Sequence, residues 1–230
     1  MAIPGLGRPE TAPPPAGSKD GKHPMTERSD VDLMLAFQAG DESAFSVLVQ
    51  RHENSVMSLT ARYLGNRADA EDLSQEVFLR VYRARKRYRP EAKFTTWLYR
   101  VAANACLNEV RRRKSRATHG AAPLREAGWD DGAAPAATGD AGAGPDEILS
   151  REELHAKVRA AVDALPERQR LALLMNKFHG LGYEELAESL ELSVPAVKSL
   201  LTRARENVRA QVEPHLHAAR PAQSARREQV

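Results

Sequence analysis

The sequence predicts an all-helical protein made of two small helical domains joined by a flexible linker. Apolar residues recur at helical spacing through two long stretches, and no stretch alternates apolar and polar residues as a strand would. A segment rich in Ala, Gly and Pro separates the two stretches. The second stretch contains a short helix, a tight turn and a basic helix, which is the layout of a helix-turn-helix DNA reader.

The composition of the 230 residues fits a cytoplasmic protein with modest cores. Hydrophobic residues make up 42% but aromatic residues only 5%, so the cores must depend on Leu, Val and Ala. Cys106 is the single cysteine, which excludes a disulfide within the chain. No apolar run reaches the roughly 18–20 residues that cross a bilayer, so we expect no direct membrane insertion.

The first domain is expected at residues 29–116, after a Pro- and Gly-rich tail, residues 1–28, that we expect to be disordered. Helical periodicity begins near Asp32, and Asp41 is a plausible N-cap for a long second helix. A third helix is expected from about Asp69 to Arg85, and a fourth from Thr95 or Thr96.

The linker is expected at residues 117–146, where acidic residues outnumber the single base Arg125. The second domain follows at residues 147–215, and residues 216–230 should form a disordered tail that begins to fray after Pro214. Within the second domain, Gly180 and Gly182 separate the middle helix from the helix-turn-helix.

The helix-turn-helix spans residues 183–205, YEELAESLELSVPAVKSLLTRAR. Helical spacing turns Val197 and Leu201 inward and leaves a polar, basic face outside. This face could be an ordinary solvated surface, but the complete pattern favours DNA, because the second helix of such a pair enters the major groove. The candidate DNA-binding residues are Lys198, Ser199, Thr202, Arg203 and Arg205.

The third helix carries acidic and polar residues on the side opposite Leu73, Val77 and Phe78. These residues are Asp69, Asp72, Gln75 and Glu76. A solvated face is the commonest fate of such residues. The strongly basic run at residues 111–116 nevertheless makes the charge asymmetric, which suggests nucleic acid on one side and a basic protein partner on the other.

Four motifs in one order resemble those of the bacterial extracytoplasmic-function (ECF) sigma factors. The stretch DAEDLSQEVFLRVYRAR at 69–85 resembles the family's core-polymerase-binding helix, and FTTWLYRVAANACLN at 94–108 resembles its minus-ten element. ALPERQRLALL at 164–174 is similar to the opening of the family's second domain, and residues 183–205 are similar to its minus-thirty-five reader. The resemblance covers about 160 residues.

This resemblance implies a sigma factor that binds core RNA polymerase at the clamp helices and flap, and directs initiation at two-part promoter DNA. It implies an anti-sigma factor as a further partner, and neither a small-molecule substrate, a cofactor, a metal nor an active site of its own. The polymerase face would be Asp69, Asp72, Gln75 and Glu76. The minus-ten contacts would be Tyr88, Lys93, Arg100, Asn104, Asn108, Arg111 and Arg112. Trp97 is expected in the core beneath the loop.

Two departures from the family pattern make the promoter sequence hard to predict. Pro195-Ala196 stands where Gly-Thr is common, and Leu200 stands where Arg is common. The alternative function is a stand-alone helix-turn-helix regulator, which would need neither the acidic third helix nor the asparagines of the fourth. An enzyme is the weakest interpretation, because the chain has no phosphate-binding glycine loop and no acid–base pair at useful spacing.

Overall fold

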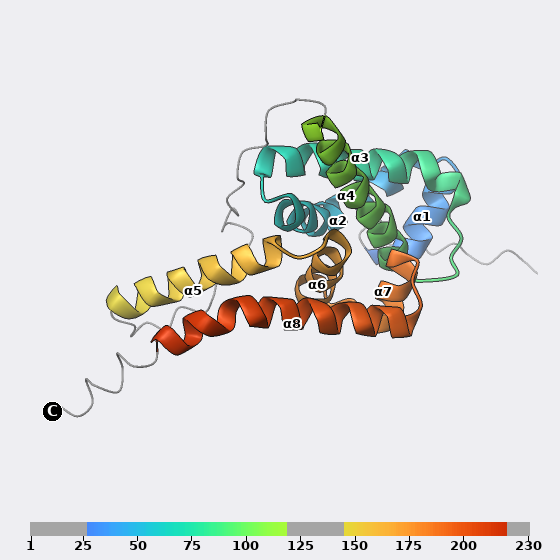
Figure 1. Ribbon diagram of the computed structural model, residues 1–230. Helices are drawn as coiled ribbons and strands as arrows, with labels where there is room; N and C mark the ends of the chain where they lie inside the picture. Colours follow the sequence, from blue (N-terminus) through green and yellow to red (C-terminus); the bar gives the residue numbers. More distant parts are fainter. Residues whose placement is uncertain (1–26, 119–144, 220–230) are drawn as a thin grey trace, which may run out of the picture.

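The computed structural model describes residues 27–118 and 145–219, and every regular element in these ranges is helical (Figure 1). The all-helical prediction is therefore confirmed, and none of the described helices is long and apolar enough to cross a membrane. The first group of elements is α1 (Asp30–Gln38), α2 (Glu42–Leu64), α3 (Arg67–Ala84), the short 3₁₀ turn η2 (Arg85–Arg87) and α4 (Phe94–Thr118). The second group is α5 (Pro145–Asp163), α6 (Glu167–His179), α7 (Tyr183–Leu190) and α8 (Val194–Ala219).

Polar caps and one glycine set the helix boundaries of the first group. The Asp41 carboxylate accepts a hydrogen bond from the Ser43 N–H (3.1 Å), so Asp41 caps α2 as expected. Gly65 ends α2 with φ 69°, a left-handed conformation that costs glycine little. The Asn66 side chain then accepts from the Asp69 N–H (3.3 Å), which starts α3 two residues before the predicted position.

The core of the first group lies where α1, α2 and α3 meet. Leu33, Met34 and Phe37 of α1 are fully buried, and the Phe37 ring stacks on Phe45 of α2 with centroids 4.7 Å apart. The amide of Gln38 donates to the carbonyl of Tyr88 (3.0 Å), which ties the loop before α4 to the end of α1. Helix α4 then packs on α3 and α2.

The second group is built on the antiparallel pair α5 and α8, which lie side by side with α6 and α7 at one end (Figure 1). Helix α8 continues through Pro214 to Ala219, so the predicted fraying after Pro214 is wrong. A proline inside a helix removes a single backbone hydrogen bond and adds a local clash. Here it comes near the end of a 26-residue helix that packs along α5, so the helix continues past it.

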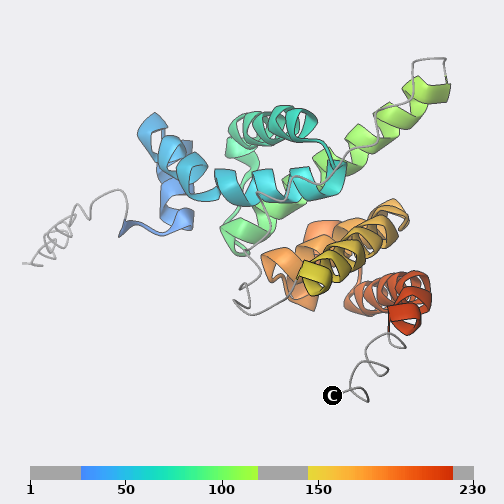
Figure 2. The same ribbon diagram turned by 90° about the vertical axis from the view of Figure 1, so that its left-hand side faces the viewer.

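The two predicted domains correspond to these two groups of helices, and the groups also pack against each other, a contact that the sequence did not predict. Figure 2 shows the helices of the second group lying against those of the first. Helix α4 packs on α7 and α2 packs on α6, and the buried residues of both groups form one continuous apolar cluster. The predicted linker lies almost entirely outside the described residues.

Candidate nucleic-acid and polymerase interface

A tight turn joins α7 to α8 and sets the angle of the predicted recognition helix. Glu191 ends α7 with φ 54°, a left-handed conformation that is uncommon for a residue with a side chain. The Leu192 N–H donates to the Ala187 carbonyl (2.8 Å), which closes the end of α7. Leu186 of α7 and Val197, Leu201 and Ala204 of α8 are then fully buried.

Burying one side of α8 leaves the predicted DNA-reading residues on the other. All of them have exposed side chains: Lys198, Ser199, Thr202, Arg203 and Arg205. Arg205 already donates to the side-chain oxygen of Asn176 on α6 (3.1 Å), and Lys198 lies 5.6 Å from the centre of the Tyr183 ring. The exposed side of α8 thus carries polar and cationic side chains of the kind that contact DNA in a major groove.

Helix α4 likewise has one buried side and one exposed side. Ala102, Ala105 and Cys106 are buried, whereas Asn104 and Asn108 are exposed one turn apart. Burial raises the pKa of the Cys106 thiol to about 12, so the thiol is unreactive at neutral pH.

The predicted cations of α4 differ in their surroundings. Arg111 is exposed and donates to the Asn108 side chain (3.2 Å), and Arg112 is exposed and pairs with Glu109 (2.6 Å). Arg100 is half-buried. Lys93, just before the helix, pairs with Glu185 of α7 (2.8 Å).

The structure does not support the predicted role of Tyr88 as a base contact in this conformation. Its side chain is only 1% exposed and meets the Trp97 ring edge-on, with centroids 5.2 Å apart. The sequence could not show this burial, because it depends on how the Tyr88 ring packs in space against the rings of Phe94 and Trp97. Trp97 itself is 9% exposed, as expected for a core aromatic.

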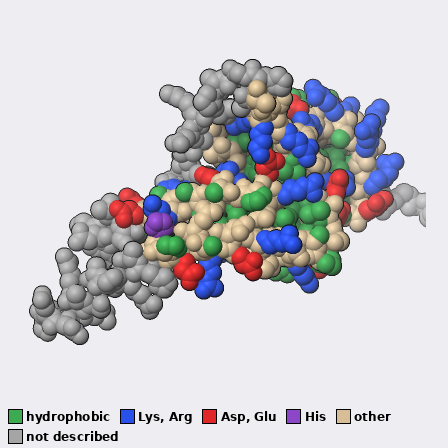
Figure 3. All heavy atoms as spheres, in the orientation of Figure 1, with side chains coloured by type: hydrophobic (Ala, Val, Ile, Leu, Met, Phe, Trp, Pro, Cys, Tyr) green, Lys and Arg blue, Asp and Glu red, His purple; other side chains and the backbone are tan. Residues whose placement is uncertain are grey.

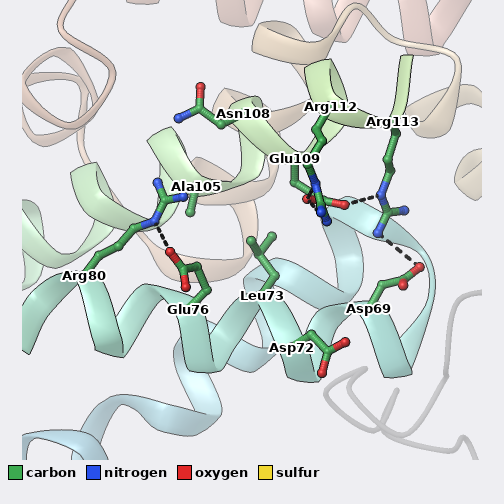
Figure 4. A pocket seen from close by; sticks show the side chains of 10 residues that line it. All are labelled: Asp69, Asp72, Leu73, Glu76, Arg80, Ala105, Asn108, Glu109, Arg112 and Arg113. Atoms are coloured by element: carbon green, nitrogen blue, oxygen red, sulfur yellow. Dashed lines mark hydrogen bonds and ion pairs between the residues drawn. The ribbon is translucent and has the colours of Figure 1, made fainter. Parts of the chain in front are cut away.

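A groove between α3 and α4 contains most of the predicted polymerase-binding residues (Figure 4). Asp69 pairs with Arg113 of α4 (3.0 Å), and Glu76 pairs with Arg80 one turn along α3 (2.9 Å). Asp72 and Gln75 are exposed on α3. The predicted face therefore divides into residues that bind neighbouring cations and residues that point to solvent.

Cations also gather at the end of α3 and through η2. Figure 3 shows Lys and Arg side chains concentrated over this part of the molecule. The exposed members are Arg83, Lys86, Arg87 and Arg89. They lie next to the loop that leads into α4, so this basic surface continues toward the predicted minus-ten residues.

Contacts between the two groups were not expected from the sequence. The Tyr99 hydroxyl of α4 hydrogen-bonds to Nδ1 of His179 (2.9 Å), and the Ser189 hydroxyl of α7 donates to the Thr96 carbonyl (3.1 Å). Burial, and then the nearby Arg62 guanidinium, lower the pKa of His179 to about 4. A neutral histidine therefore lies in the interface at physiological pH.

Two arginines add to the same interface. Arg170 of α6 donates to the carbonyl of Arg62 near the end of α2 (3.1 Å), where the helix dipole favours a cation. The Arg62 guanidinium lies over the Phe178 ring of α6, 4.2 Å from its centre. The sequence offered no signal for these pairs, because the partners are separated by about a hundred positions along the chain.

Comparison with known proteins identifies the family to which the chain belongs. Residues 48–116 match the family model of Sigma-70 region 2, and residues 155–208 match that of Sigma-70, region 4. The chain is 34% identical over 192 residues to the ECF RNA polymerase sigma-E factor of Escherichia coli K12, covering 83% of this chain and 98% of the relative. It is 32% identical over 195 residues to the RNA polymerase sigma-H factor of Pseudomonas aeruginosa, covering 85% and 100%.

Solved structures share the fold. The structure of CnrH in complex with the cytosolic domain of CnrY has a TM-score of 0.57 at 24% identity, covering 81% of this chain and 99% of that one. The sigma factor RpoE of Bartonella quintana, solved with the anti-sigma factor NepR, has a TM-score of 0.53 at 15% identity, covering 74% and 96%.

The two matched regions contain the α3–α4 groove and the α7–α8 helix pair, and they place both in one class of protein, the transcription initiation factors that act with RNA polymerase. The chain belongs to the ECF group of the sigma-70 family, as the identity to sigma-E and sigma-H over nearly their full lengths shows. It is therefore a sigma factor that directs transcription initiation.

Proposed function

We propose that α8 reads the minus-thirty-five element in duplex DNA and that α4 holds the minus-ten strand. The observation that carries this proposal is the division of both helices into a buried apolar side and an exposed polar side. The exposed sides hold Lys198, Ser199, Thr202 and Arg203 on α8, and Asn104 and Asn108 on α4. Arginine binds guanine in bidentate fashion, and asparagine amides can hydrogen-bond to the edges of bases.

We propose that polymerase binds the outer stripe of α3. Asp69 and Glu76 already have cationic partners within the chain, so Asp72 and Gln75 are the better candidates for direct contacts. Leu79 lies one turn beyond Gln75 and is 50% exposed, which adds an apolar contact to the same stripe. A polar rim around an apolar centre is the usual composition of a protein interface.

Run-off transcription tests both assignments together. The purified chain is added to bacterial core RNA polymerase and a library of templates with randomised upstream sequence. New transcripts should begin downstream of one enriched two-part sequence. If the chain neither binds core polymerase nor enriches any sequence, the proposed function is wrong. The stand-alone regulator would instead bind duplex DNA without polymerase, and no feature of the α3–α4 groove favours it.

Two further parts of the function rest on the relatives. RpoE of Bartonella quintana was solved with an anti-sigma factor, and we propose that an anti-sigma factor also binds this chain. We propose that the chain acts in the cytoplasm, where its polymerase partner works. Contact with the polymerase flap remains a prediction, and the path of the linker lies outside the described residues.

A further inference from the structure

Arg205 lies on the flank of α8, between the buried side of this helix and the side that faces solvent. Leu201 and Ala204 are fully buried and mark the side that packs on α6 and α7. Ser199 and Arg203 are exposed on the opposite side. At about 100° per residue, Arg205 falls between these two sides, so its guanidinium is within reach of α6 as well as of a bound duplex.

The guanidinium of Arg205 bonds to α6 in this structure. It donates to Oδ1 of Asn176 (3.1 Å), which is half-buried on α6. Nδ2 of Asn176 in turn donates to the carbonyl of Leu181, in the turn before α7 (2.9 Å). Asn176 therefore uses both ends of its amide, and the three residues form a chain of hydrogen bonds from α8 through α6 to the start of α7.

A second bond holds the other flank of α8. Asn207 donates to Oε1 of Gln169 on α6 (3.0 Å). About 200° around the helix separates Asn207 from Arg205, so the two bonds lie on either side of the buried stripe. A rotation of α8 by about 20° would move an atom about 6 Å from the axis by roughly 2 Å, which is enough to break either bond. The two bonds therefore oppose rotation of α8 about its own axis.

We propose that Arg205 is a positioning residue for promoter recognition, where the sequence predicted a direct DNA contact. Through Asn176 it sets the rotation of α8, and with it the alignment of Ser199, Thr202 and Arg203 with the bases. This inference rests on the proposed role of α8 in reading the minus-thirty-five element. Hydrogen bonds to base edges need this precision, because they weaken steeply outside a range of about 2.7–3.2 Å and when poorly aligned.

The test measures how the complex of this chain with core RNA polymerase binds two fluorescein-labelled duplex templates, followed by anisotropy. One template carries the two-part sequence enriched in the run-off selection, and in the other the minus-thirty-five part is scrambled. The variants are R205A, N176A and the double variant R205A/N176A. Circular dichroism verifies that each variant is folded.

The matched control is R209A. It removes the same charge from the same helix at an exposed position, where the side chain pairs with Glu213 further along α8 (3.6 Å). The control should bind both templates as the unmodified chain does.

We expect R205A and N176A each to weaken binding to the selected template about three- to tenfold, as the loss of one ordinary hydrogen bond allows. The double variant should lose no more than either single variant, because the two residues act through one bond. Binding to the scrambled template should not change. The slope of log affinity against log salt should also stay the same, because no phosphate contact is lost.

A different pattern would show that Arg205 binds DNA directly. An equal loss on both templates for R205A, with a salt slope lower by about one, would identify a phosphate contact and overturn the proposal. Additive losses in the double variant would also overturn it, since independent contacts add. Unchanged binding of the selected template by R205A would do the same.

The unmodified chain separates this proposal from the proposed function. If it selects no sequence with core polymerase, the proposed function itself fails. If it selects a two-part sequence and R205A behaves like the control R209A, only the positioning role of Arg205 fails.

Discussion

Acid should open the interface between the two groups of helices through His179. In the closed chain burial and Arg62 of α2 lower the pKa of His179 to about 4, and its hydrogen-bond partner is the Tyr99 hydroxyl of α4. Opening removes the burial, the arginine and the tyrosine together, so the pKa should return to about 6.5. The open form then binds a proton more readily than the closed form.

The sign and size of the effect follow from this difference. Above pH 6.5 the histidine is neutral in both forms, and the closed form keeps its full stability. Below pH 6.5 the open form takes up a proton first, so stability of the closed form is lost as the pH falls toward 4. The opening constant should rise about tenfold between pH 8 and pH 5.5. The full shift corresponds to about 3.4 kcal/mol as an upper bound, and His179 is only half-buried, so a smaller total is expected.

Fluorescence energy transfer between the two groups can follow the opening. Cysteines introduced by Glu91→Cys and Glu206→Cys lie at exposed positions in different groups, and buried Cys106 will not compete for the dyes. Transfer should fall as the pH is lowered from 8 to 5.5. The variant His179→Asn cannot titrate and should remove most of this pH dependence. If the variant shows the same pH dependence as the unmodified chain, or if neither responds, the reasoning is wrong.

Three further changes test the DNA face, the polymerase face and the fold. Arg203→Ala should weaken promoter binding by about 1–3 kcal/mol and relax one base preference; a loss that is uniform across sequences, with a salt slope reduced by about one, would show a phosphate contact instead. Asp72→Arg should lower affinity for core polymerase in a pull-down by at least tenfold, about 1.4 kcal/mol, whereas Glu76→Gln should have a smaller effect because Glu76 binds Arg80. Gly180→Ala should lower the free energy of unfolding in urea by about 1 kcal/mol, because alanine disfavours the left-handed φ of +67° at this position. An added Cβ meets no atom within 4 Å, so the backbone conformation is the source of this cost, and an unchanged urea midpoint would contradict the prediction.

Local patterns in the sequence identified most elements of this protein. The N-cap Asp41 and the turn between α7 and α8 were predicted from short stretches, because caps and turns depend on residues only a few positions apart. The same reasoning separated the buried Val197 and Leu201 from the exposed Lys198 and Arg203, because helical periodicity decides which side of a helix meets the core. The family was likewise evident from motifs within single helices.

Burial and ion pairing of particular predicted residues depended on tertiary contacts. Tyr88 has an aromatic side chain that could contact a base, but packing with Trp97 and Phe94 buries it. Asp69 looks like a docking carboxylate, but Arg113 of α4 pairs with it (3.0 Å). In both cases the partner's position in space, and not only the residue's own type, sets what the side chain can contact.

The sequence by itself determined that this chain is an all-helical sigma factor, and it predicted which two helices read DNA. Only the tertiary structure decided that its two groups of helices close on each other, with Glu185 on Lys93 and His179 on Tyr99. The physical reason is distance along the chain. Periodicity, caps and motifs act over a few residues, whereas these contacts join residues 80 or more positions apart, and no local pattern records them.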